Sequence, residues 1–267
     1  MKKSKRMALP KAYLVFLLLV MYLPIALVII YSFNASRISS VWNGFTLDWY
    51  RSLFRDRSMF EALRNSVVLA VVSSCAAAVI GTLGAYGMSR VKLRGSGAME
   101  YLSMLPIMIP EIILGMVFLV FFSLIGLPFG MTTLIIAHTA FNIPYVFLMV
   151  KARLAGFDGS LTDAARDLGA GELRTFTDIT LPLIAPAILS GMLLSFAMSF
   201  DDVIISVFVT GVNTNTLPIK IYSQIKTGVT PKTNALCTLL FLVTVILGLS
   251  SVLVSRRGAN RKSGKDE

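Results

Sequence analysis

Three carboxylates lie within strongly apolar stretches of the chain, and they are the residues best suited to chemistry. Glu111 follows Pro106 and Pro110 in LPIMIPEIILG, and Asp201 and Asp202 are adjacent in SFDDVIIS. A rise of about 1.5 Å per helical residue places Glu111 roughly 15 Å and the aspartates roughly 27 Å along their apolar runs. An ionised carboxylate at mid-membrane costs about 2.5–3.5 kcal/mol unless it faces water or a partner. These acids therefore indicate a path for cations.

Polar side chains continue along the segment that carries the aspartates. Ser195, Ser199, Asp202 and Ser206 are separated by four, three and four residues, and this spacing places them on one face of a helix. A polar stripe on an otherwise apolar helix is typical of a helix that lines a pathway.

The alternative is a structural role for the acids, which would be protonated or hydrogen-bonded to neighbouring helices. The apolar runs contain no lysine or arginine that could neutralise them, which favours a passing cation as the missing partner. His138 is the only histidine. A lone histidine in a span more often satisfies a hydrogen bond within a helix bundle than binds a substrate.

The elements that would carry these residues are membrane spans. The chain has 267 residues, 55% of them hydrophobic, and a mean hydropathy of +0.76. Apolar runs of about 20 residues cross about 30 Å of hydrocarbon as helices, because lipid admits only helices or closed barrels. We expect an all-α, polytopic membrane protein with six transmembrane helices, at about 12–32, 65–89, 101–125, 132–150, 183–208 and 235–255.

The net charge of +11 orients the chain in the membrane and predicts no nucleic-acid partner. Of the 25 lysines and arginines, 17 lie before span one, between spans two and three, between spans four and five, or in the tail, against 8 in the other loops. The positive-inside rule therefore places both termini and residues 151–182 in the cytoplasm. The basic N-terminus precedes an apolar run that is too long for a signal peptide, so we expect a retained first span.

We expect the chain to divide into three parts. Residues 1–64 hold the N-terminal cytoplasmic segment, the first span and a long periplasmic loop, residues 65–255 form the transmembrane domain, and residues 256–267 form a basic cytoplasmic tail. Trp42, Trp49 and Tyr50 in the first loop suit either a short element at the membrane interface or a solvated loop. Glycines and prolines between 209 and 234 predict a loop broken by turns.

A polar segment at 160–182 separates spans four and five. Its residues fit the spacing D/E-A-A-x(3)-G-x(9)-I-x-L-P with Asp163, Ala164, Ala165, Gly169, Ile179, Leu181 and Pro182. We expect a short helix that stops at Gly169, then a second helix from about 172 to 179 that ends before Leu181-Pro182. Small residues at 169–171 would let the groove of another protein approach closely. An ordinary amphipathic connector is the alternative.

This spacing resembles the coupling loop of bacterial ABC-importer permeases, which docks onto an ATPase subunit. Nearly the whole chain resembles the permease subunits of spermidine/putrescine ABC importers, of the PotC type. The segments that carry this resemblance are SFN, GFTLDWY, IPEIILG, RLAGFDGSLTDAARDLGA, LSFAMSFDDVIISVFVTG and LPIKIYSQIKTGVTPKTNAL. One departure is Asp163 in place of Glu, which keeps the negative charge near the helix start.

The resemblance implies a type I ABC importer permease (MetI-like) fold and a transport subunit of the inner membrane rather than an enzyme. The chain would pair with a second, PotB-type permease, a homodimeric ATPase that binds ATP and Mg²⁺, and a periplasmic polyamine-binding protein. We expect no cofactor in this chain, because it has no GxxxxGK[ST] motif. Cys75 and Cys237 lie within predicted spans and lack the spacing of a metal site.

Two other functions stay open. One is an importer permease for another cargo, such as thiamine, ferric iron or a phosphonate, although acids without basic residues disfavour an anion. The other is a secondary transporter of cations, for which intramembrane acids are equally natural. Such a transporter has no use for an ATPase-docking loop, and the sequence shows no inverted repeat.

Overall fold

Helices make up the regular structure of the chain wherever it is described. The computed structural model describes residues 3–37, 41–90, 95–156, 159–212 and 214–246. Across these ranges the elements are helices, apart from an isolated antiparallel bridge between Asn34 and Phe45. The chain divides into two compact units, one of residues 1–57 with 223–267 and one of residues 58–222.

The first unit contains α1 (Lys3–Tyr31), α2 (Asp48–Phe54) and a shorter apolar helix, Pro231–Ile246. The part of α1 from Tyr13 to Tyr31 is long and apolar enough to cross a membrane. Its side chains, such as Phe16 and Leu19, are exposed. A helix that is apolar all round suits lipid or another apolar protein surface.

The SFN segment holds the first loop of this unit together through the fully buried Asn34. Its Nδ2 donates to the carbonyl oxygen of Val41 at 2.7 Å, and its Oδ1 accepts from the backbone N–H groups of Ser36 and Asn43. The indole of Trp49 donates to the carbonyl oxygen of Asn34 at 2.7 Å. The loop is therefore a folded element, because a buried amide with these partners fixes its backbone.

The second unit is built on three long helices, α3 (Arg57–Arg90), α6 (Met131–Ala155) and α9 (Leu181–Asp201). Glycines let α6 approach both of the others. A Cβ on Gly81 of α3 would lie 3.0 Å from Val146 Cβ, and a Cβ on Gly191 of α9 would lie 3.0 Å from Val146 Cα. Small residues at such crossings bring apolar helices close enough to gain dispersion energy.

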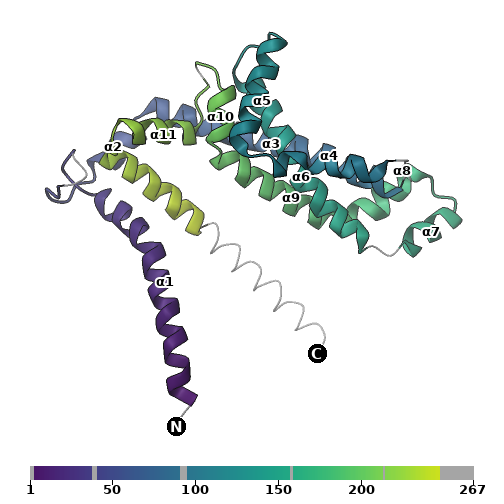
Figure 1. Cartoon of the computed structure of the whole chain (residues 1–267), viewed down its shortest axis with the longest axis horizontal. Coiled ribbons are helices and arrows are strands. Elements are labelled where there is room, and N and C mark those ends of the chain that lie inside the picture. Colours follow the sequence, from purple (N-terminus) through teal and green to yellow (C-terminus); the bar gives the residue numbers. More distant parts are fainter. Residues whose placement is uncertain (1–2, 38–40, 91–94, 157–158, 213, 247–267) are drawn as a thin grey trace. The chain divides into compact units, whose positions relative to one another are not determined.

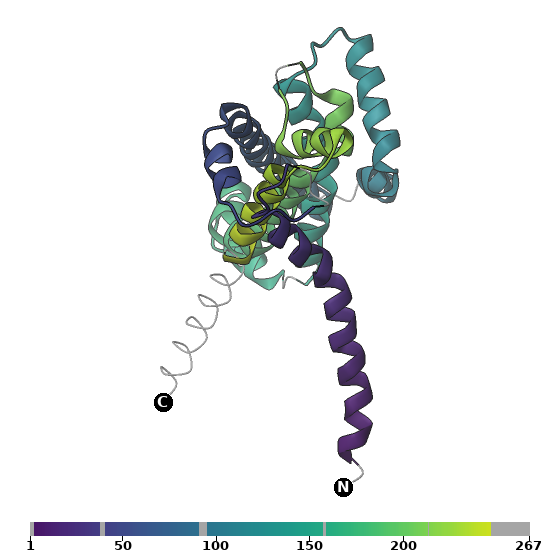
Figure 2. The same ribbon diagram turned by 90° about the vertical axis from the view of Figure 1, so that its left-hand side faces the viewer.

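The predicted third span consists of two helices, α4 (Ser96–Met108) and α5 (Glu111–Leu124), bent by 104°. Pro110 disfavours a helical backbone at Ile109, whose ψ is 130°. The helix is therefore interrupted directly before Glu111. α5 stands upright in Figures 1 and 2, whereas α4 lies across Figure 1 and is seen end on in Figure 2.

The fifth span differs from its prediction at both ends. α8 (Glu172–Thr175), a π-helical turn (Phe176–Thr180) and α9 run on as one helix to Asp201. The expected end before Leu181-Pro182 is therefore wrong. A proline clashes with the carbonyl four residues earlier in a regular α-helix, and the wider π turn before Pro182 relieves that clash.

The outer end of this span was predicted at residue 208, but α9 ends at Asp201. Asp202 has an extended ψ of 129°, and a separate short helix, α10 (Ile204–Val209), begins after it. α11 (Leu217–Thr227) follows after a further break. The segment after residue 209 is thus interrupted by turns, as its glycines and prolines predict.

The expected number of spans is met only in part. Among the described residues, four helices are long and apolar enough to cross a membrane, or five if α4 and α5 count as one bent span. Of the sixth predicted span, residues 235–246 belong to the shorter helix Pro231–Ile246, and the rest lie outside the described residues, as does the basic tail. The all-α class is confirmed, whereas the number six is not.

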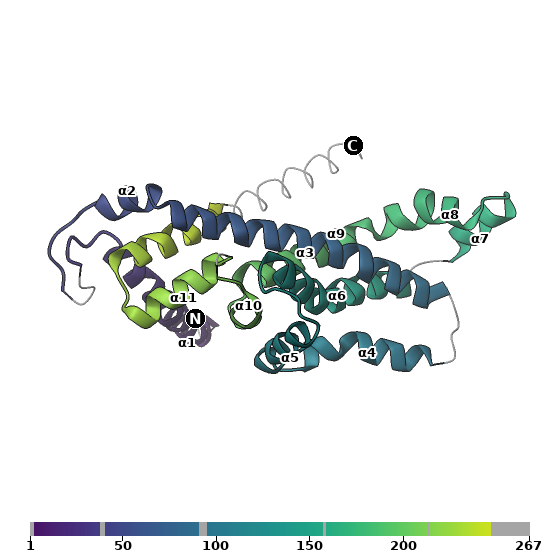
Figure 3. The same ribbon diagram turned by 90° about the horizontal axis from the view of Figure 1, so that it is seen from above.

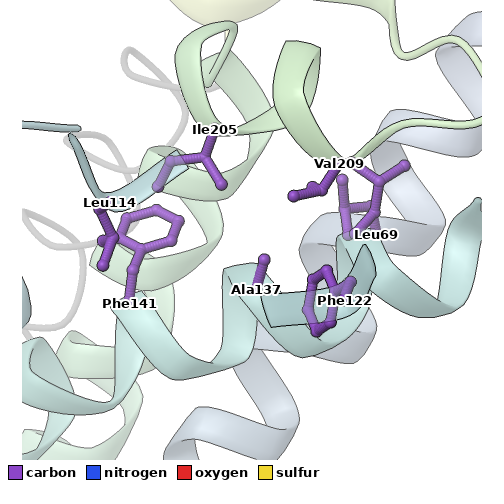
Figure 4. Close-up of a cluster of buried hydrophobic side chains, with 8 residues drawn as sticks. Leu69, Leu114, Phe122, Ala137, Phe141, Ile205 and Val209 are labelled. Atoms are coloured by element: carbon purple, nitrogen blue, oxygen red, sulfur yellow. The ribbon is translucent and has the colours of Figure 1, made fainter. Parts of the chain in front are cut away.

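α10 packs into an apolar cluster between α5 and α6 (Figure 4). Ile205 and Val209 of α10 lie with Leu114 and Phe122 of α5 and with Phe141 of α6. Burying a side chain of this size contributes about 1.5–3 kcal/mol relative to exposure in water. The placement of α10 and that of α5 therefore depend on each other.

Candidate functional site

The predicted functional residues of the second unit gather at two places along α9. α7 (Ser160–Asp167) and α8 lie at one end of this unit, whereas α10 and α5 lie toward the other (Figures 1 and 3). α8, the π turn and α9 form one helix between the two places. A continuous helix is a rigid element that can carry a displacement from one place to the other.

Gly169 ends α7 in a left-handed turn. Its φ is +83°, its N–H donates to the carbonyl of Arg166 at 2.8 Å, and the N–H of Ala170 donates to the carbonyl of Ala165 at 3.0 Å. These two bonds form a Schellman motif, in which glycine is favoured because it adopts positive φ without a Cβ clash. The predicted stop at Gly169 is confirmed.

The turn after α7 presents apolar and small residues to the outside. Leu168 and Leu173 are 88% and 77% exposed on either side of it. A Cβ on Gly169 or Gly171 would meet nothing within 4 Å. Exposed leucines beside an open glycine turn are typical of a surface that another protein covers.

The other predicted coupling residues divide between the turn and the long helix. Asp163 and Ala164 are exposed on α7, and Ala165 is half-buried beside them. Ile179 and Leu181 are half-buried and Pro182 is exposed, all three within the continuous helix. The structure therefore brings the first part of the motif together at the turn and places the last part at the base of α9.

Glu111 and Asp201 are exposed carboxylates at helix ends. Glu111 is the first residue of α5, directly after the bend, and Asp201 is the last residue of α9. Neither forms an ion pair with another described residue. A carboxylate favours a helix N-terminus, as at Glu111, but is unfavourable at a C-terminus, as at Asp201. A carboxylate in such an electrostatically unfavourable position is typical of a residue that binds a ligand.

Asp202, in contrast, faces into the unit, and its side chain is 5% exposed. Its Oδ1 accepts a hydrogen bond from the N–H of Ile205 at 3.2 Å, and its Oδ2 accepts one from the N–H of Ser206 at 2.8 Å. Oδ2 also lies 3.4 Å from Nε2 of His138. Asp202 therefore caps the start of α10, so the two adjacent aspartates have different surroundings.

His138 joins this cap to the rest of the bundle. Its ring bonds Ser199 Oγ through Nδ1 at 2.8 Å and Ser206 Oγ through Nε2 at 3.0 Å. Ser199 Oγ in turn bonds Ser73 Oγ of α3 at 3.1 Å. The prediction that His138 satisfies hydrogen bonds within the bundle is confirmed. The contact of His138 with Asp202 is not expected from the sequence, in which the lone histidine is the one signal of it.

The predicted serine stripe lies inside the unit. Ser195, Ser199 and Ser206 are each 2% exposed or less. A pathway shared by two subunits is lined by side chains that each subunit exposes, so the hydroxyls of these serines do not face such a pathway in this conformation. Their role as pathway residues stays a prediction.

Comparison with known proteins decides the family. Residues 77–260 match the family described as "Binding-protein-dependent transport system inner membrane component". The chain belongs to this family. It is therefore an inner-membrane component of a transport system and not an enzyme, as the resemblance of its sequence implies.

Three proteins to which the chain is similar are permease proteins of spermidine/putrescine or putrescine transport systems. The chain is 39% identical over 244 residues to the spermidine/putrescine permease protein PotC of Escherichia coli (strain K12), over 91% of this chain and 92% of that protein. Its identity to PotC of Haemophilus influenzae is 37% over 252 residues (94% and 98%). Its identity to the putrescine permease protein PotI of E. coli (strain K12) is 38% over 249 residues (91% and 89%).

Solved structures of ABC transporters show the same fold. A bacterial ABC transporter involved in the import of alginate matches with a TM-score of 0.73 at 15% identity, over 96% of this chain and 98% of that one. The MetNI methionine ABC transporter matches with a TM-score of 0.60 at 18% identity, over 79% and 98%. The predicted importer-permease fold is confirmed.

Proposed function

We propose that this chain is the permease subunit of an ABC importer that moves polyamines, spermidine or putrescine or both, into the cytoplasm. The observation that carries the proposal is the pair of exposed carboxylates at Glu111 and Asp201, in a chain whose relatives are named for spermidine and putrescine transport.

The chemistry of the cargo suits these acids. Polyamines carry two or more ammonium groups along an apolar chain, so a pathway for them needs separate carboxylates with apolar surface between. The attraction between opposite charges about 4 Å apart is roughly 4 kcal/mol at an effective dielectric of about 20. That energy guides a cation without trapping it. Exposed acids without basic neighbours disfavour an anion such as a phosphonate.

The exposed turn after α7 supports a separate ATPase partner. Leu168 and Leu173 would seat in a groove of that subunit, and the continuous helix from Glu172 to Asp201 would carry its movement to the acids. We infer that a second, PotB-type permease completes the pathway around Glu111 and Asp201. A homodimeric ATPase binds ATP and Mg²⁺ on the cytoplasmic side, and a periplasmic polyamine-binding protein delivers the cargo.

The test is uptake by variants that remove charge and keep size. Glu111→Gln and Asp201→Asn, expressed with the partner subunits, should lower uptake of radiolabelled spermidine or putrescine by about tenfold for at least one variant, which corresponds to about 1.4 kcal/mol. Asp48→Asn is the control, because Asp48 is an exposed carboxylate on α2, which belongs to the first unit, whereas Glu111 and Asp201 belong to the second. If both variants take up polyamine as well as the wild type does, the cation path is wrong. If the wild-type protein takes up an anion and no polyamine, the cargo assignment is wrong.

A further inference from the structure

The break between α9 and α10 is fixed by a side chain from a third helix. His138 of α6 bonds Ser199, which precedes the break, and Ser206, which follows it, at 2.8 and 3.0 Å. Asp202, at the break, accepts two backbone N–H groups of α10 and lies 3.4 Å from His138 Nε2. One imidazole ring therefore holds both sides of the break.

This arrangement controls where the two exposed acids lie. Asp201 precedes Asp202 in the chain, so the cap that holds Asp202 also holds the backbone that carries the Asp201 side chain. α10 also packs against α5, where a Cβ on Gly115 would lie 2.5 Å from a ring carbon of Phe208. Glu111 lies one helical turn before Gly115 on the same face of α5. A shift of α10 would therefore displace α5, and with it Glu111. The same shift would displace Asp201, because Asp201 is joined to α10 by the intervening chain.

We propose that His138 and Asp202 are positioning residues that set the separation of Asp201 and Glu111, and thereby the length of polyamine that the pathway prefers. The proposal rests on the proposed function for its cargo. Two carboxylates held at one separation favour the amine whose ammonium groups have a matching separation, whereas loosely held carboxylates accept several lengths. Asp202 itself does not touch the cargo, because its oxygens are occupied by the cap.

The first test compares variants that keep or remove each hydrogen bond. Asparagine is a good helix cap. Asp202→Asn should therefore keep the ratio of the KM values for putrescine and spermidine within about twofold of the wild-type ratio. Asp202→Ala removes the cap and should shift this ratio by about fivefold or more. His138→Gln, which can supply a polar group near the position of Nε2, should preserve the ratio, whereas His138→Asn, which replaces only Nδ1, should shift it.

Two outcomes of this test would overturn the positioning role. A rise of both KM values in Asp202→Asn as large as that in Asp201→Asn would show that Asp202 binds the cargo directly. A wild-type KM ratio in Asp202→Ala and His138→Asn at normal expression would show that the network only supports the fold.

A second measurement does not depend on the cargo. In a Cys75→Ser, Cys237→Ser background, nitroxide labels attached through Glu111→Cys and Asp201→Cys report the separation of the two sites. The distance distribution should broaden or shift with Asp202→Ala and stay narrow with Asp202→Asn. Identical distributions in both variants would overturn the positioning role even if polyamine transport holds. If the distance distributions change as expected but the wild-type protein takes up no polyamine, the positioning role of His138 and Asp202 stands and the polyamine cargo is rejected.

Discussion

Arg166 Nη2 lies 2.7 Å from Oε1 of Glu172, so an ion pair closes the glycine turn between α7 and α8. The same guanidinium lies 3.6 Å from Asp163 on its own helix. The hydrogen bond and the negative charge of Glu172 raise the pKa of Arg166 above its usual value. The hydrogen bond from Arg166 lowers the pKa of Glu172, which favours its charged form. Because both side chains are exposed to solvent, the pair contributes little to stability. The pair joins α7 to α8 beside the exposed Leu168 and Leu173.

We predict that breaking this pair uncouples transport more than it unfolds the protein. Arg166→Glu and Glu172→Arg alone should each lower uptake and ATPase co-purification by several-fold, and the double variant should recover part of both, because it restores the pair in reverse. Arg174→Gln is the control, since it removes an exposed pair with Asp178 on one side of the turn only. Equal loss in the single and double variants would show that the pair does not act as a pair.

We predict that Gly169→Trp leaves the protein in the membrane, abolishes transport and weakens ATPase co-purification. Positive φ makes any side chain at this position costly by about 1 kcal/mol, and bulk would obstruct the seat in the partner. Gly169→Asn should be milder, because asparagine tolerates a left-handed backbone. Gly97→Trp is the control, since Gly97 is exposed on α4 with nothing within 4 Å of a Cβ. Normal transport by Gly169→Trp would reduce the turn to a connector.

The orientation in the membrane gives a third prediction. Reporter fusions after Lys151, after Lys226 and at the C-terminus should read cytoplasmic, periplasmic and cytoplasmic, because 17 of the 25 basic residues lie on one predicted side. Activity of a periplasmic reporter after Lys151 would reverse the orientation and remove the ATPase-docking role from residues 160–182.

A fourth prediction concerns the loop that follows α10. A Cβ on Gly211 would lie 2.2 Å from the carbonyl oxygen of Phe129, so Gly211→Ala should destabilise the protein by about 1–3 kcal/mol. Thermal unfolding of the purified protein in detergent should show a lower Tm. Gly87→Ala on α3, where nothing lies within 4 Å, should keep or raise the Tm, because alanine is the better helix former. If Gly211→Ala has the Tm of the wild type, the loop accommodates the added methyl group without a loss of stability.

Local features of this protein follow from its sequence alone. The stop of α7 at Gly169 is a backbone property of glycine, and the bend before Glu111 follows from the restriction that Pro110 places on Ile109. Apolar runs of span length, the basic loops between them and the coupling spacing are equally local. Each of these depends on residues close together in the chain, so a sequence can specify it.

The spacing along the helix groups Asp202 with the serine stripe and leaves Asp201 off it, but only packing decides that the stripe is buried and that Asp201 is exposed. The sequence could not show that His138 meets Asp202, since that contact depends on how α6 lies against α9 and α10. Pro182 is the opposite case: a local rule predicts a helix end there, and the π turn before it lets the helix continue. Tertiary packing therefore decided which acid is available to a cargo, and which one holds the helices in place.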